Sequence, residues 1–263
     1  MDWDDAYSNA KYIEGAEIFP IEWKSNAQIY RDKLLAEGRA KLDQSYGPHL
    51  RHRYDLFKPL QTPKGIFVFI HGGYWLDFDK NTWSHFVETA VEAGYLAFVP
   101  SYRLAPDVSI PEIISDIQSF IEVISEKFCG PITIAGHSAG GHLATSMGFC
   151  KNGLKRYLIQ RIQHIISISG IFDLTPLQCT SMNKLLQVTD NIKYTCNPID
   201  CEPSNHIHFS CFVGQHERPE FLRQNALLKH YWPDKNITEI IVPHKHHFDV
   251  IEILRDDRYG FFK

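Results

Sequence analysis

The stretch Gly136-His137-Ser138-Ala139-Gly140 decides which fold this sequence adopts. The apolar run 131–135 precedes it, and a segment of small residues, 141–150, follows it. An apolar run, a tight turn and a helix in this order form a strand–turn–helix unit, and flanking glycines let neighbouring backbone pass close to the serine. We therefore expect Ser138 on a sharp turn at the carboxyl end of a buried strand.

Short apolar runs alternate with amphipathic segments on both sides of this turn. The runs lack period-two alternation, which is typical of strands buried on both faces of a parallel sheet. Segments 83–91 and 113–124 carry apolar residues at helical spacing. The sequence therefore predicts an α/β class fold, a mostly parallel, doubly wound sheet with helices on both faces. The expected strands are 66–70, 95–99, 132–135, 165–169, 208–213 and 239–242.

The 263 residues fit a single α/β domain, 1–263, because such folds reach ~250 residues as one unit. Residues 1–60 do not follow the alternation of apolar runs and helical segments. They predict one amphipathic helix near 22–37, followed by a segment that leads to the first buried strand. Residues 171–205 have weak periodicity and contain Pro and Cys. We expect them to form a cap-like insertion over the edge of the sheet.

Charge and composition exclude several classes of protein. Hydrophobic residues make up 44% and charged residues 22%, which is typical of globular chains, and the net charge is −4. No basic run exceeds the triplet 51–53, so neither nucleic acid nor an anionic membrane is an expected partner. The acidic start 1–5 and the lack of a long apolar stretch predict a cytoplasmic protein, whose six cysteines stay reduced.

A serine at such a turn becomes a nucleophile when a histidine takes its proton and a carboxylate orients that histidine. In this fold the chain order is Ser, then Asp or Glu, then His. His247 follows the last apolar run and is the predicted base, with His246 as the alternative. A metal site is another reading of the three histidines His244, His246 and His247, but no second ligand group is spaced to complete it. We expect neither a metal nor another cofactor.

The acid is expected in the loop after the run 208–213. Glu217 and Glu220 both qualify, but Glu220 falls in the first turn of the next helix, where the helix dipole alone explains a carboxylate. Glu217 is therefore the predicted acid. Asp173 is the reserve, whereas Asp249 is better explained as a helix-start residue.

The stretch His71-Gly72-Gly73-Tyr74-Trp75 directly follows the first apolar run. Glycines at this position turn backbone N–H groups toward the nucleophile, so Gly72 and Gly73, together with Ala139, are the predicted oxyanion hole. The side chains of His71, Tyr74 and Trp75, with Tyr102, are candidates for the substrate pocket. Aromatic residues at strand ends are also explained by simple packing.

Six segments together resemble the arylformamidase (kynurenine formamidase) branch of the α/β-hydrolases. The resemblance implies that Ser138 is the nucleophile, His247 the base and Glu217 the triad acid, with Gly72, Gly73 and Ala139 as the oxyanion hole. Two departures put the substrate in doubt, since the family commonly has Asp at Glu217 and Asp at His246. The six segments are 71–75, 101–106, 136–141, 169–174, 214–224 and 247–249.

Three functions remain open at this point. The first is an arylformamidase that releases formate from N-formyl-kynurenine, and the second is a short-chain carboxylesterase of unknown substrate. The third is a non-catalytic binding protein with a hydrolase fold, because fold alone does not fix function. In each case the expected partner is a small molecule, and a homodimer stays open.

Overall fold

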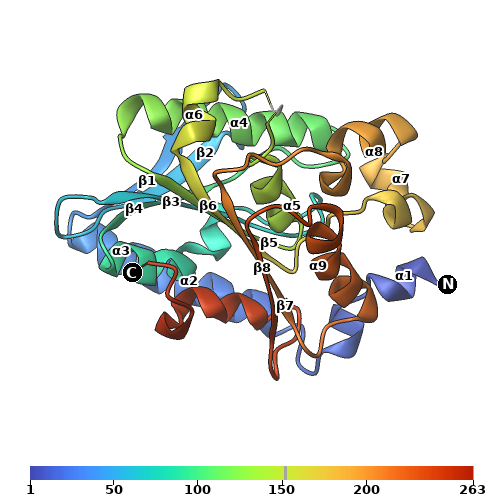
Figure 1. Ribbon diagram of the computed structural model, residues 1–263. Helices are drawn as coiled ribbons and strands as arrows, with labels where there is room; N and C mark the ends of the chain where they lie inside the picture. Colours follow the sequence, from blue (N-terminus) through green and yellow to red (C-terminus); the bar gives the residue numbers. More distant parts are fainter. Residues whose placement is uncertain (151–152, 263) are drawn as a thin grey trace.

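An eight-stranded sheet runs through the molecule in the order β1-β2-β4-β3-β5-β6-β7-β8 (Figure 1). It belongs to a computed structural model that describes residues 1–150 and 153–262. The pairs β1–β2 and β2–β4 are antiparallel, and all other neighbours are parallel. The strands are β1 Ala40–Ser45, β2 Arg53–Phe57, β3 Gly65–Ile70, β4 Tyr95–Pro100, β5 Ile132–His137, β6 Ile162–Ile168, β7 His208–Gly214 and β8 Ile237–Val242.

The six predicted strands correspond to β3 to β8, and the expected α/β class with a mostly parallel sheet is confirmed. The antiparallel strands β1 and β2 were not predicted, because neither has a continuous apolar run. In β2 the charged Asp55 is completely buried, where it binds Lys80 Nζ at 2.8 Å and lies 3.4 Å from Arg31 Nε. Hydrophobic periodicity cannot find a strand whose core position is an ion pair.

Helices cover both faces of the sheet (Figure 1). On β3, Ile66 and Val68 belong to the core that contains α4, α5 and α9, whereas Phe67 and Phe69 belong to the core under α2 and α3. This alternation divides the interior into two layers. The helices are α1 Trp3–Ala6, α2 Phe19–Ala36, α3 Glu88–Glu92, α4 Ile110–Lys127, α5 Ala139–Ser146, α6 Arg156–Arg161, α7 Asn183–Leu186, α8 Asp190–Cys196 and α9 Pro219–Tyr231. Short 3₁₀ helices are η1 Ala10–Tyr12, η2 Lys80–Thr82, η3 Ser84–Val87, η4 Thr175–Cys179, η5 Pro198–Asp200, η6 Val250–Arg255 and η7 Asp257–Tyr259.

The segment 171–205 connects β6 to β7 and contains η4, α7, α8 and η5. Within it, α8 contacts α4, while η5 contacts α5 and α9. The segment therefore packs on the face that carries α4, α5 and α9, and not over an edge of the sheet, since the edges are β1 and β8.

In the described part of the chain, no helix combines the length and apolar character needed to cross a bilayer.

Candidate active site

Ser138 stands on a strained turn between β5 and α5. Its backbone has φ 56° and ψ −120°, a region that costs a non-glycine residue about 1–3 kcal/mol. The turn is held because Ser138 N–H donates to Ile168 O at 2.8 Å and Gly141 N–H donates to Ser138 O at 2.9 Å. A Cβ atom at Gly136 would overlap the carbonyl of Gly140, so the turn requires glycine at that position.

His247 and Glu217 come from the loops that follow β8 and β7, and the structure brings their side chains together. His247 Nδ1 lies 2.6 Å from Glu217 Oε2, and both side chains are buried. The other oxygen, Oε1, accepts from Ser169 Oγ at 2.5 Å and from Gly214 N–H at 2.7 Å. The carboxylate is thus fixed at both oxygens, and it accepts the Nδ1 proton of His247 in a charge-assisted hydrogen bond.

The alternative residues for these roles have other partners. Glu220 is buried, but its Oε1 accepts from Tyr7 Oη at 2.9 Å and its Oε2 from Arg223 at 2.9 Å. Asp173 pairs with Arg223 at 2.9 Å. His246 is partly exposed, and its backbone N–H donates to Asp249 at 2.7 Å. Asp249 stands at the N-cap of η6, the helix-start position expected for it, although its side chain accepts no N–H from that helix.

A cavity of about 280 Å³ opens at these residues, and Ser138 and His247 both line it. Within the described ranges no hydrogen bond joins their side chains, and such bonds often tighten only when substrate binds. No described group of three or more His, Cys, Asp or Glu residues is arranged to hold a metal ion.

The predicted oxyanion glycines lie directly against the turn at Ser138. A Cβ atom at Gly72 would stand 2.8 Å from His137 O and 3.1 Å from Ser138 Cβ, and Gly73 has φ 104°. Outside helices and strands, no hydrogen bond within the described ranges uses the N–H groups of Gly72, Gly73 or Ala139 as donors. These amides are therefore available to donate hydrogen bonds to an anion bound beside Ser138.

Of the four side chains expected in the substrate pocket, Tyr74 lines the cavity. His71, Trp75 and Tyr102 are completely buried and are not among its lining residues. The Tyr102 ring stacks on His71 with centroids 4.3 Å apart and its hydroxyl donates to His71 O at 2.8 Å, while burial lowers the pKa of His71 to about 4. The structure therefore gives these three side chains packing positions in the interior and not in the pocket.

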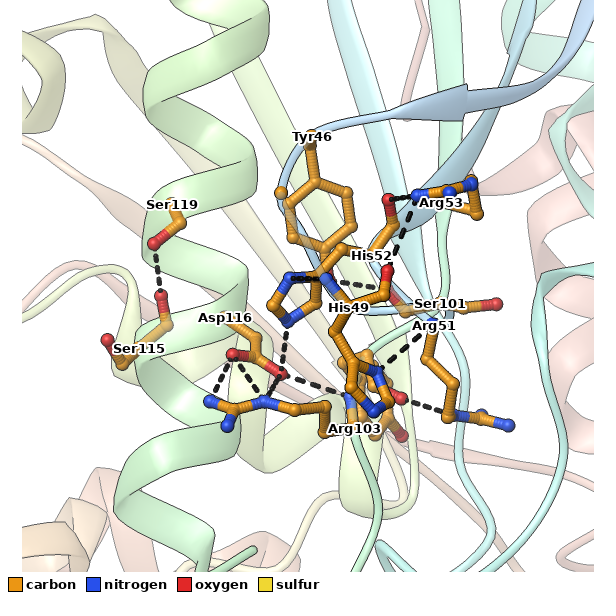
Figure 2. A network of polar contacts seen from close by, with 12 residues as sticks. Tyr46, His49, Arg51, His52, Arg53, Ser101, Arg103, Ser115, Asp116 and Ser119 are labelled. Carbon is orange, nitrogen blue, oxygen red and sulfur yellow. Dashed lines mark hydrogen bonds and ion pairs between the residues drawn. The ribbon is translucent and has the colours of Figure 1, made fainter.

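A polar network around Arg103 and Asp116 holds the start of the segment 101–106 in place (Figure 2). Asp116 of α4 accepts a two-pronged ion pair from Arg103 and lies 3.2 Å from His52 Nε2. Arg51 donates to Tyr102 O at 2.6 Å and to Phe78 O at 2.5 Å. The network therefore connects α4 and the β1–β2 region to a residue of the cavity wall, Phe78.

Much of the cavity wall comes from the N-terminal segment, which sequence reasoning missed. Tyr7 donates to Glu220 of α9, and Tyr74 Oη donates to the Tyr7 carbonyl at 2.7 Å. Glu220 lies 213 positions from Tyr7, so no local pattern could have shown this contact. The segment 171–205, expected to act as a cap, contributes no lining residue. The wall residues before the first strand are Tyr7, Ser8, Asn9, Ala10, Pro20 and Trp23.

The mostly parallel sheet, with the sharp turn at Ser138 after its fifth strand, is that of an α/β-hydrolase. The sequence model of the BD-FAE family matches residues 54–199, and the chain belongs to that family. The predicted resemblance to the arylformamidase-like branch is also confirmed. The kynurenine formamidases of Salmo salar and Danio rerio are 27% and 25% identical to the chain, and both alignments cover 83% of it and 78% of the relative.

Solved structures give the same class. A crystal structure from Silicibacter sp., provisionally named a thioesterase, is 41% identical with a TM-score of 0.92, covering 97% of this chain and 95% of that one. The Pyrobaculum calidifontis esterase, at 18% identity and TM-score 0.68 over 94% and 91% of the two chains, supports the fold alone. The named relatives are hydrolases, so the chain is a hydrolytic enzyme and the non-catalytic alternative falls away.

Proposed function

We propose that the protein is a cofactor-free serine hydrolase that cleaves aryl formamides, with N-formyl-kynurenine as substrate and kynurenine and formate as products. The observation that carries the chemistry is the 2.6 Å hydrogen bond between His247 Nδ1 and Glu217 Oε2 at the cavity that Ser138 lines. The resemblance to kynurenine formamidases supports the substrate.

The first half of the reaction forms a formyl-enzyme. Ser138 Oγ attacks the formyl carbon while His247 Nε2 takes the hydroxyl proton, and Glu217 stabilises the resulting imidazolium. The carbonyl oxygen becomes an oxyanion that accepts hydrogen bonds from the amides of Gly72, Gly73 and Ala139. Each such donor contributes about 3 kcal/mol to transition-state stabilisation. His247 then returns the proton to the departing nitrogen, which leaves as the free amine.

The second half repeats these roles with water. His247 removes a proton from a water molecule, whose oxygen attacks the formyl ester, and the Ser138 oxygen leaves with that proton. Formate and the free serine result, so no oxidant, metal or cofactor enters the balance. Protonation of the nitrogen is the more demanding task in amide cleavage, because an aniline leaves poorly as its anion.

The cavity supports an aromatic substrate. Four rings contact one another in its wall, with Trp23–Trp83 centroids 4.8 Å apart, Trp23–Phe248 at 5.5 Å and Phe78–Trp83 at 5.4 Å. Flat apolar walls favour a planar ring, which can stack or meet them edge-on. Such a cavity fits the aryl group of a formamide next to Ser138.

A short-chain esterase or thioesterase is the second candidate. The observation in its favour is the 41% identity to the Silicibacter protein, which exceeds the identity to the kynurenine formamidases. Cleavage of an ester or thioester uses the same nucleophile and oxyanion hole. A less effective general acid is sufficient for it, because the leaving group departs more easily.

The two candidates are separated by a comparison of kcat/KM for N-formyl-kynurenine, p-nitrophenyl acetate and an acyl thioester. We expect the value for N-formyl-kynurenine to exceed that for the acetate by at least ~10-fold, which corresponds to about 1.4 kcal/mol in transition-state binding. A higher value for the acetate or the thioester contradicts the formamidase assignment and supports the second candidate.

A further inference from the structure

His137 stands one residue before Ser138, and none of the proposed steps uses it. Its side chain is buried and lines the cavity beside Ser138 and His247. His137 Nε2 lies 2.8 Å from the backbone oxygen of His247, a residue 110 positions further along the chain. This hydrogen bond joins the strand that carries the nucleophile to the loop that carries the base.

The direction of that bond fixes the protonation of the His137 ring. A carbonyl oxygen accepts and cannot donate, so Nε2 carries a proton. Burial, followed by the nearby His247, lowers the pKa of His137 well below its usual value, so the ring is neutral and Nδ1 is unprotonated. Nδ1 has no hydrogen-bond partner in the described ranges.

A neutral His137 ring is compatible with the positive charge that His247 acquires during the proposed reaction. The two imidazoles have centroids 4.8 Å apart, and His247 becomes a cation in each half of the reaction. A charged His137 would oppose that cation at short range. As a neutral donor it holds the backbone of His247 without adding charge to the site.

The loop that carries His247, the base loop, is also held by contacts with the end of β7 and the residues that follow it. His216 N–H donates to Lys245 O at 2.8 Å, and a Cβ atom at Gly214 would overlap that same carbonyl. These contacts hold the loop against the end of β7. His137 supplies the contact from β5, and its own carbonyl lies against Gly72 of the oxyanion loop.

We propose that His137 is a positioning residue whose Nε2–H donor sets the base loop against the nucleophile turn, so that His247 Nε2 faces Ser138 Oγ. The proposal rests on the Ser138–His247 pair of the proposed function, but it does not depend on the identity of the acyl group. The role requires a hydrogen-bond donor at position 137, and it requires no charge there.

The test compares three variants in the full chain. His137→Phe keeps a planar ring without a donor, whereas His137→Gln offers an amide N–H that can reach the same carbonyl. His142→Phe is the matched control, because His142 is also completely buried and its Nε2 binds a backbone oxygen, that of Cys196 at 2.9 Å. The readouts are kcat and KM for p-nitrophenyl acetate and the rate of labelling by a fluorophosphonate.

We expect His137→Phe to lower kcat and the labelling rate at least ~10-fold while KM changes less than ~3-fold. His137→Gln should recover most of that loss, and His142→Phe should keep kcat within ~3-fold of the wild type. Equal losses in H137F and H137Q, a wild-type kcat in H137F, or an equal loss in H142F would each overturn the proposal.

A measurement on the unmodified protein covers the case in which H137F does not fold. Nitrogen-15 NMR of the histidine rings at neutral pH should find His137 protonated at Nε2 and bare at Nδ1, and the opposite tautomer or a cation contradicts the proposal. Ser138→Ala is run alongside. If S138A still hydrolyses the acetate, the proposed function fails; if S138A is inactive while H137F is normal, only the role of His137 fails.

Discussion

Replacing Glu217 by Gln changes one oxygen to an NH₂ group in a place where three donors converge. These donors are His247 Nδ1, Ser169 Oγ and Gly214 N–H. If the amide oxygen faces Ser169 and Gly214, the NH₂ group faces Nδ1 and selects the tautomer with the proton on Nε2. That tautomer cannot take a proton from Ser138. If the amide is reversed, two donors meet at Gly214.

Either orientation is costly, and the two costs appear in different measurements. The wrong tautomer should lower kcat by roughly 10⁴-fold, as the equivalent change does in a serine protease. KM should change little, because the lost interaction acts in the transition state. The mismatched donor should lower the free energy of unfolding by about 1–3 kcal/mol. Steady-state kinetics and thermal unfolding measure the two effects separately.

Asp173→Asn is the matched control, because Asp173 is the reserve acid and binds Arg223 instead of a histidine. Its kcat should stay within ~3-fold of the wild type. If E217Q kept its kcat while D173N lost activity, the acid assignment and the tautomer argument would both be refuted.

Three further predictions concern the oxyanion loop, the buried histidines and the N-terminal wall. Gly72→Ala should lower kcat by about 100-fold or more in steady-state assays, because its methyl group would stand 2.8 Å from His137 O and displace an oxyanion donor. Unaltered turnover would remove Gly72 from the hole. Burial lowers the pKa of His71 and of His142 to about 4, so folding excludes protons that the unfolded chain binds. The free energy of unfolding should therefore be constant with respect to these groups above pH ~6.5 and fall toward pH ~4, by about 3 kcal/mol for each histidine. Urea titrations between pH 7 and pH 4 measure this, and a smaller slope in His142→Phe is expected. Tyr7→Phe removes the hydroxyl that donates to Glu220, so KM for aryl substrates should rise a few-fold while kcat holds; an unchanged KM would mean that this anchor does not shape the cavity.

The features that the sequence predicts depend on neighbouring residues or on chain order. The turn at Ser138 needs glycines and follows an apolar strand, so its position can be read from neighbouring residues alone. The placement of His247 and Glu217 follows from chain order and from the ends of two further strands. These features repeat in any chain that builds the same fold.

The missed features depend on contacts between distant parts of the chain. Tyr7 lines the cavity because Glu220 and Tyr74 hold it there, and β2 is a strand although its buried Asp55 is charged. Trp75 lies two residues after Gly73 in sequence, yet its side chain points into the core and contacts His142. The direction in which a side chain points from a loop is set by packing, and the sequence pattern does not encode it.

The central claim is that Ser138 is the nucleophile, and covalent labelling tests it most directly. The protein is treated with a fluorophosphonate and digested, and the modified peptide is sequenced by mass spectrometry. The account predicts a single adduct on Ser138, none in Ser138→Ala, and loss of hydrolysis in parallel with labelling. An adduct on another serine, with hydrolysis retained in Ser138→Ala, would contradict the account.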